Sequence, residues 1–334
     1  MRRPVARVIP GIVLLALGGG LAQLLAGTVV PINELIVAVG LGALLANTVG
    51  TPAWAKSGIA THKLWLETGI VLMGARIAIG QLFSVGPALL VFVVGFLTIS
   101  LVIGEAIARN VFRINERLGS LLAAGYAVCG VSAIVAVSGS VRAKSEQIAY
   151  AVATILLFDA ATLAVYPIIG RRLELPDIVF GTWAGVSMVS TGPVVAAGFA
   201  YSPQAGEWAT VTKLGRNVFI GVVAVLYAVY YARQRDTGQA GGASWRYLWE
   251  EFPKFVIGFL AMAGIASLGL LSSDDVALLT SGYQGLFLVA FVGLGMEIDL
   301  RKMRSVGIKP VLVVFSSLLV VSLLSLLASM LLFG

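Results

Sequence analysis

Long apolar runs separated by short polar turns occupy almost the whole chain. A helix needs about 20 mostly apolar residues to cross the hydrocarbon core of a membrane. The runs that meet this length predict transmembrane helices at 8–28, 31–48, 63–80, 85–107, 118–139, 146–169, 177–199, 207–232, 252–271, 276–299 and 308–332. The pattern therefore predicts an all-α polytopic membrane protein with about eleven transmembrane helices.

Composition agrees with this prediction. The 334 residues are 59% hydrophobic and 12% charged, whereas a soluble domain has about 25% charged residues. One cysteine, Cys129, and one histidine, His62, leave no internal disulfide and no His-rich metal site. The spans hold no paired-acid, HExxH or Ser/His arrangement. We therefore expect no cofactor, no metal and no enzyme activity.

The basic residues fall at alternate turns between the predicted spans. Such bases occur at 2–7, 56–63, 109–117, 171–172, 233–246 and 301–309. The positive-inside rule then places the N-terminus in the cytoplasm and the C-terminus outside, in a bacterial inner (plasma) membrane. This rule also accounts for the net charge of +7, so no nucleic acid is expected as a partner. Arg142 and Lys144 break the rule, because they follow the fifth span.

The chain is expected to form a single transmembrane domain over 1–334 in contact with membrane lipid. Its longest polar connection, 233–251, predicts a loop with a short interfacial helix. The sequence leaves the oligomeric state open, with a homodimer as one alternative.

A weak internal repeat relates two distant segments. GARIAIGQLFSVG at 74–86 aligns with GMEIDLRKMRSVG at 295–307, and five positions are identical. These stretches lie within the matching segments 63–107 and 276–332, whose first spans are seven helices apart. An odd separation predicts an inverted-topology repeat, and chance similarity among small residues is the alternative.

Two spans carry signals for a helix that is interrupted inside the membrane. In the fifth, Gly130 is expected to break the helix and Ser132 to cap a half-helix. In the seventh, Ser190 and Thr191 precede Gly192 and Pro193, which is typical of a helix start with proline at the first helical position. Paired interruptions indicate a transporter's binding site, and half-helix N-termini attract anions. Close packing of small residues is the alternative.

Several charges are predicted to lie within the membrane. Helical spacing puts Thr210, Lys213, Arg216 and Asn217 on one face of the eighth span, and an interior role is favoured over snorkelling to the interface. Asp159, near the middle of the sixth span, is the candidate for binding H⁺ or Na⁺. Arg76, in the third span, needs a partner elsewhere and is a second ion-coupling candidate.

The assembled motifs resemble a known bacterial family. They are GYAVCGVSAIVAV at 125–137, VRAKSEQIAYAVATILLF at 141–158, GTWAGVSMVSTGPVVAAG at 181–198, VTKLGR at 211–216, PKFVIGF at 253–259 and VGLGMEIDL at 292–300. They resemble the YeiH-type conserved hypothetical membrane proteins, which carry a sulfate-exporter label. The resemblance implies a transporter distantly similar to cation/proton antiporters and bile-acid-type symporters, with inverted repeats and crossed broken helices.

The chain also departs from that family pattern. Val189, Ser190 and Pro193 stand where relatives usually have a His, an acidic residue and a Gln, and Asp159 stands where they usually have Gly. These differences imply a changed coupling ion or substrate.

Three functions remain open from the sequence. The leading hypothesis is a secondary transporter of a small anion, such as sulfate or an organosulfonate, coupled to H⁺ or Na⁺. Its predicted substrate-binding residues are Cys129, Gly130, Ser132, Ser190, Thr191, Gly192, Pro193, Lys213, Arg216 and Asn217. The alternatives are a cation/proton antiporter and a scaffold or sensor that transports nothing.

Overall fold

The fold is entirely helical over the residues that the computed structural model describes, which are 8–26, 33–76, 79–233, 253–299 and 307–334. Within these ranges, five helices are long and apolar enough to cross a membrane, and shorter apolar helices accompany them. The five are Gly86–Val111, Ser145–Arg172, Pro203–Tyr231, Ser273–Met296 and Ile308–Phe333. The predicted all-α polytopic fold is therefore confirmed, while the interfacial helix predicted at 233–251 lies almost entirely outside the described residues.

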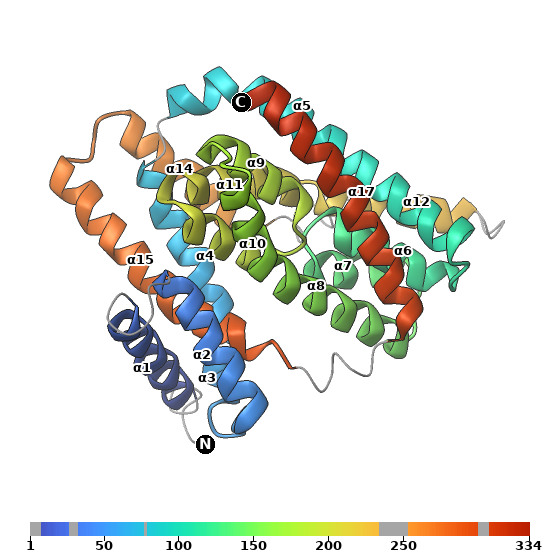
Figure 1. Cartoon of the computed structure of the whole chain (residues 1–334), viewed down its shortest axis with the longest axis horizontal. Helices are drawn as coiled ribbons and strands as arrows, with labels where there is room; N and C mark the ends of the chain where they lie inside the picture. Colours follow the sequence, from blue (N-terminus) through green and yellow to red (C-terminus); the bar gives the residue numbers. More distant parts are fainter. Residues whose placement is uncertain (1–7, 27–32, 77–78, 234–252, 300–306) are drawn as a thin grey trace. The chain divides into compact units, whose positions relative to one another are not determined.

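The chain divides into two compact units, 1–87 with 254–301 and 88–253 with 302–334. The first unit contains α1 (Ile9–Leu25), α2 (Glu34–Thr48), α3 (Lys56–Ile59), α4 (His62–Met73), η2 (Gly74–Arg76), α14 (Phe255–Ser267) and α15 (Ser273–Met296). Within it, α15 packs against α1, α2 and α4 (Figure 1). A Cβ on Gly42 would lie 2.0 Å from Val292 O, so glycine is what lets α2 and α15 approach closely.

The second unit contains most of α5 (Ile79–Ala106), the π-helical turn η3 (Ile107–Val111) and the helices that follow. These are α6 (Glu116–Ala127), α7 (Val131–Val141), α8 (Ser145–Arg172), α9 (Asp177–Ser187), α10 (Thr191–Tyr201), α11 (Pro203–Asn217), α12 (Ile220–Arg233) and α17 (Ile308–Phe333). Helix α17, red in Figure 1, packs across α6, α8 and α9.

Helices α6 and α7 fold back on each other and form a hairpin, which we call the first hairpin. Arg117 Nη1, at the start of α6, donates to Arg142 O, just after the end of α7, at 3.0 Å. In one continuous helix these residues would be about 37 Å apart. Segment 118–139 therefore does not run through as a single span.

Helices α9 and α10 form the second hairpin in the same way. The hydroxyl of Ser202, after α10, donates to Asp177 Oδ1 at the start of α9 at 2.6 Å. The ring of Tyr201 stacks on Phe180 with centroids 4.0 Å apart. Segment 177–199 thus also returns to the end at which it began.

Helix α8 connects the bases of the two hairpins. In its first turn Gln147 Nε2 donates to Asn115 Oδ1 at the base of the first hairpin, at 2.7 Å. In its last turn Arg171 Nη2 donates to Ala200 O in the second hairpin, at 2.8 Å. The 28 residues of α8 span about 42 Å, so the hairpins enter from opposite ends of the unit. The crossed through-going broken helices implied by the family resemblance are replaced by two opposed hairpins.

This arrangement changes the interpretation of the basic residues. Because the first hairpin returns to its own base, Arg142 lies at the same end as Arg117 and no longer breaks the charge rule. Arg171 and Arg172 lie at the opposite end of α8. Their assignment to the same side as 109–117 was wrong, because counting apolar runs treats a hairpin as a crossing.

Thiol labelling tests the hairpins directly, since Cys129 is the only cysteine. In a Cys129→Ser background, Arg113→Cys and Lys144→Cys are expected to react with a membrane-impermeant maleimide from one side of the membrane. Arg172→Cys and Gln204→Cys are expected to react from the other side. All four positions are exposed. Labelling of positions 113 and 144 from opposite sides of the membrane would contradict the first hairpin. Labelling of positions 172 and 204 from opposite sides would contradict the second hairpin.

Candidate functional site

The tips of the two hairpins meet beside the middle of α8. A Cβ added to Gly130, in the first tip, would lie 2.1 Å from Ser190 Oγ in the second tip and 3.2 Å from Ile155 on α8. Gly130 has a φ of +75°, a conformation that side-chain-bearing residues rarely adopt. The break predicted at Gly130 is confirmed, and it brings two polar turns together inside an apolar unit.

The N-termini of α7 and α10, the second helices of the two hairpins, differ in detail from the predicted caps. Helix α7 begins at Val131 with Gly130 as its N-cap, so Ser132 is its second residue and the cap prediction was wrong. Helix α10 begins at Thr191 with Ser190 as its N-cap. Pro193 is then the third helical residue and not the first, with Gly192 between. It still lies within the first turn, where its missing N–H removes no intrahelical bond.

Arg216, on α11, binds backbone carbonyl groups at the C-terminal ends of α6 and α9, which are the first helices of the two hairpins. Its Nε donates to Ala127 O at 2.8 Å and its Nη1 to Met188 O at 3.0 Å. Further bonds reach Tyr126 O, Gly185 O and Val186 O. Arg216 is fully buried, so one guanidinium group ties the tip of the first hairpin to the tip of the second.

Lys213 does the same one helical turn earlier on α11. Its ammonium donates to Val128 O at 3.0 Å, to Met188 O at 3.1 Å and also to Val189 O. It too is fully buried. The prediction that this face of the eighth span points to the protein interior is therefore confirmed.

These contacts explain why two cations are buried in one place. The last carbonyls of α6 and α9 have no intrahelical partner and carry the negative end of each helix dipole. Arg216 and Lys213 satisfy these carbonyls inside an apolar unit, where unsatisfied carbonyls would be costly. The positive ends of α7 and α10 begin in the same two tips, only three or four residues further on.

Asp159 lies at one of these positive ends. It follows the start of α8 by 14 residues and precedes its end by 13, and its Oδ1 accepts the backbone N–H of Ser190 at 2.9 Å. Its side chain is 5% exposed, and it is the only carboxylate among the described residues in the buried class. An acid predicted at mid-span thus reaches the tip of the second hairpin.

Other predicted residues surround the tips. Asn217 Nδ2 donates to the Thr191 hydroxyl at 2.9 Å, while its buried Oδ1 has no hydrogen-bond partner among the described residues. Cys129, Ser190 and Thr191 are partly exposed and Ser132 is exposed. Gly130, the N-cap of α7, has no side chain to cap the helix, and the Cys129 thiol interacts with the Ala133 N–H and with Ser132 in its first turn. The tips therefore contain partly or fully exposed residues that carry hydroxyl and thiol groups.

Arg76 is the one predicted site residue that belongs to the first unit. It ends η2, and its Nη1 donates to the Tyr283 hydroxyl of α15 at 3.3 Å. Its ion-coupling role stays a prediction. Most of the repeat that includes it falls on 77–78, on 300–306 or on side chains outside the described residues, so the inverted repeat is also untested.

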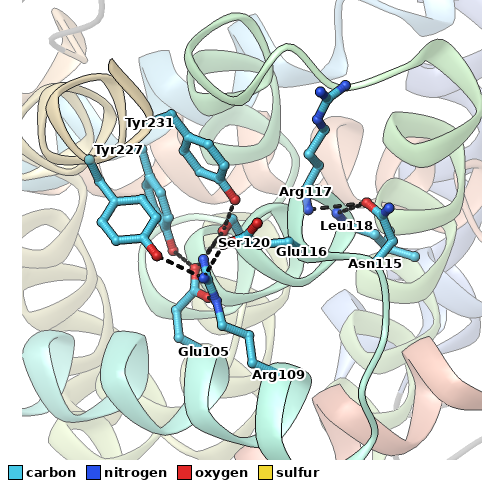
Figure 2. Close-up of polar contacts among 10 residues, drawn as sticks. Glu105, Arg109, Asn115, Glu116, Arg117, Leu118, Ser120, Tyr227 and Tyr231 are labelled. Carbon is cyan, nitrogen blue, oxygen red and sulfur yellow. Dashed lines mark hydrogen bonds and ion pairs between the residues drawn. The ribbon is translucent and has the colours of Figure 1, made fainter. Parts of the chain in front are cut away.

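A polar cluster that the sequence interpretation missed joins α5, α6 and α12 (Figure 2). The carboxylate of Glu105 accepts Arg109 Nε at 2.5 Å, Ser120 Oγ at 2.6 Å and Tyr227 Oη at 2.7 Å. Arg109 also pairs with Glu116. A glutamate near the end of an apolar span, four residues before an arginine, was the available signal.

The fold and these tips define the chain as a polytopic α-helical membrane protein with two opposed re-entrant hairpins. The profile of the family described as conserved hypothetical protein 698 matches residues 10–314. The chain therefore belongs to this family, which confirms the resemblance that the motifs indicated.

Named relatives agree with this membership. A UPF0324 membrane protein of Nitratidesulfovibrio vulgaris is 34% identical over 284 residues, which cover 84% of this chain and 79% of the relative. One of Vibrio vulnificus is 34% identical over 293 residues, covering 86% and 89%. One of Bacillus cereus is 29% identical over 279 residues, covering 83% and 80%. These names state a membrane protein and no substrate.

Proposed function

We propose that this protein is a secondary active transporter of a small anion, coupled to H⁺ or Na⁺, with its binding site at the two hairpin tips. The observation that carries the proposal is the meeting of both tips at mid-α8, beside the buried carboxylate of Asp159. Interrupted helices whose ends converge inside a membrane protein are typical of transporter binding sites. We place the protein in a bacterial inner membrane, with its N-terminus in the cytoplasm and its C-terminus outside.

The anion is assigned to the N-terminus of α7. The N-cap there is Gly130, which leaves the first N–H groups without a cap from their own N-cap residue, and the Cys129 thiol and Ser132 lie in the same first turn. The corresponding position of α10 already holds the Asp159 carboxylate. Lys213 and Arg216 contribute positive potential through the tips rather than by contact, because their donors bind backbone carbonyls. Sulfate or an organosulfonate matches this chemistry.

Asp159 is assigned the coupling ion. Protonation or Na⁺ binding at Asp159 would weaken its bond to the Ser190 N–H and change the charge beside the anion. Asn217 Oδ1, a buried acceptor with no described partner, adds a second oxygen near the same tip. Ionisable groups at membrane depth are functional candidates by default.

The test is uptake of labelled sulfate into proteoliposomes under an imposed pH or Na⁺ gradient. We expect one gradient to drive uptake, and Asp159→Asn to reduce the gradient-dependent part by about tenfold or more, because the coupling group would be gone. Glu146→Gln is the matched control, since Glu146 is an exposed carboxylate in the first turn of the same helix. Its uptake should stay within about twofold of the wild type. Normal coupled uptake by Asp159→Asn would refute the assignment.

A cation/proton antiporter is the second candidate. It is favoured by the electrostatic interaction between buried Asp159 and buried Lys213, since such a pair can exchange a proton for a cation. The same proteoliposomes, loaded with a pH-sensitive dye, distinguish the two functions. Proton movement on addition of Na⁺ or K⁺, without anion uptake, would support the antiporter.

A further inference from the structure

A groove of about 920 Å³ runs between α5 with η3 and α12 in the second unit. The two walls run in the same direction, because Glu105 contacts Tyr227 and, further along both walls, Arg109 Nη1 of η3 donates to the Tyr230 hydroxyl at 2.9 Å. The walls come from one compact unit, and the groove is separate from the hairpin tips described above.

The lining of this groove changes from apolar to cationic in the same direction on both walls. On one wall, Leu101 and Val102 of α5 are followed by Arg109 of η3, and on α12, Leu226 is followed by Tyr230 and Arg233. Val102 and Leu226 are 61% and 56% exposed. A site that is apolar at one end and positively charged at the other fits an amphiphile with an acyl chain and an anionic head.

One of the two cations at the polar end is available to a negative group. Two cations and one carboxylate, Glu105, line the groove. Glu105 is already bound by Arg109, Ser120 and Tyr227, and the Arg109 guanidinium also lies 5.2 Å from the centre of the Tyr230 ring. Arg233 is exposed and forms no ion pair with any described residue. Arg109 is paired with Glu105 and Glu116, so Arg233 is the cation of the lining that has no ion-pair partner among the described residues.

The polar end of the groove lies at the depth in the membrane at which lipid head groups are found. Its polar end lies where the two candidate spans Gly86–Val111 and Pro203–Tyr231 end. Basic pockets between the ends of membrane helices bind anionic lipid head groups. The π-helical turn at Ile107–Val111 departs from regular α-helix at the same level, as often occurs at functional sites.

We propose that this groove binds one anionic phospholipid, with its phosphodiester between Arg233 and Arg109 and an acyl chain along Leu101, Val102 and Leu226. The site is independent of the transported substrate. Zwitterionic lipids share the acyl chains but add an ammonium group, which the nearby Arg233 disfavours.

Native mass spectrometry of the delipidated, purified full chain tests the proposal with dioleoylphosphatidylglycerol and dioleoylphosphatidylcholine as probes. The wild type is expected to bind the phosphatidylglycerol about fivefold more tightly or better. Arg233→Gln should remove this preference, and Leu226→Trp, which fills the groove, should weaken binding of both lipids. Thermal unfolding of each variant confirms that it is folded.

Arg172→Gln is the matched control, because Arg172 is an exposed arginine at the last turn of another membrane helix. It should keep the lipid preference. Equal binding of the two lipids by the wild type, or equal losses in Arg233→Gln and Arg172→Gln, would overturn the proposal. A dimer that dissociates in Leu226→Trp while lipid binding is unchanged would overturn it in favour of a second copy of this chain.

Discussion

An Arg216→Ala variant is expected to lose several kcal/mol of stability and all transport, because it removes five hydrogen bonds that help to join the two hairpins. Arg216 binds three described carbonyl groups at the end of α9 and two at the end of α6. Each buried acceptor left without a donor costs about 1–3 kcal/mol. Lys213 already uses its ammonium on neighbouring carbonyls, so it cannot replace the arginine.

Thermal unfolding of the purified protein in detergent measures this effect. We expect the melting temperature of Arg216→Ala to fall by more than about 5 °C. Arg216→Lys should recover only part of the loss, since one ammonium lacks the planar fork that reaches both helix ends. Arg172→Ala, which removes an exposed arginine, should melt within about 2 °C of the wild type. If Arg216→Ala melted like Arg172→Ala, the hairpin tips would not depend on Arg216.

The sequence predicted the location of the interruptions better than their geometry. Gly130 and the Ser190–Thr191 pair were identified because glycine, hydroxyl residues and proline within an apolar run are typical of the start or end of a helix. Whether a helix continues after such a break depends on contacts between its two halves, such as Arg117 with Arg142. Hydrophobicity is the same for two half-helices that continue or fold back, so run length could not distinguish a span from a hairpin.

For the buried charges, too, the sequence predicted the location but not the contacts. The polar face of α11 was predicted to point inward, because an apolar stretch too short to cross alone forces Lys213 and Arg216 into the membrane. Their partners are seven backbone carbonyls far away in sequence, at positions 126, 127, 128, 185, 186, 188 and 189. Backbone groups leave no trace in residue identity, and therefore a capping role for these cations could not be predicted.

The one sequence signal for the first hairpin was the apparent exception to the charge rule. Arg142 and Lys144 contradicted a through-going fifth span, and a hairpin removes the contradiction. With the hairpin in place, Arg171 and Arg172 become the bases that break the charge rule. Arg171 Nη2 donates a hydrogen bond to Ala200 O. A base whose guanidinium binds the protein is a weaker indicator of sidedness than one that faces solvent.

A Gly130→Ala variant is expected to be nearly as damaging as Arg216→Ala, although it adds only a methyl group. Gly130 has φ +75° and ψ −125°, and a side chain in such a sparsely populated region costs about 1–3 kcal/mol. The new Cβ would also lie 2.1 Å from Ser190 Oγ. We therefore expect the tips to separate, with loss of transport and a melting temperature lowered by more than about 5 °C.

A second variant separates the two causes. Ser190→Gly removes the hydroxyl that the methyl group would meet, so Gly130→Ala/Ser190→Gly should regain the steric part of the loss but not the backbone part. The Ser190 N–H that binds Asp159 is retained in both. A double-mutant cycle that includes Ser190→Gly alone isolates the interaction between the tips.

Gly139→Ala is the control, since it adds the same methyl group to α7 where no atom lies within 4 Å of the new Cβ. It should leave transport unchanged and raise stability by up to about 1 kcal/mol, because alanine favours a helix more than glycine does. A Gly130→Ala protein that melted like Gly139→Ala would mean that the two tips do not touch. The binding site would then need another location, because the convergence of the tips is the observation on which the transport proposal depends.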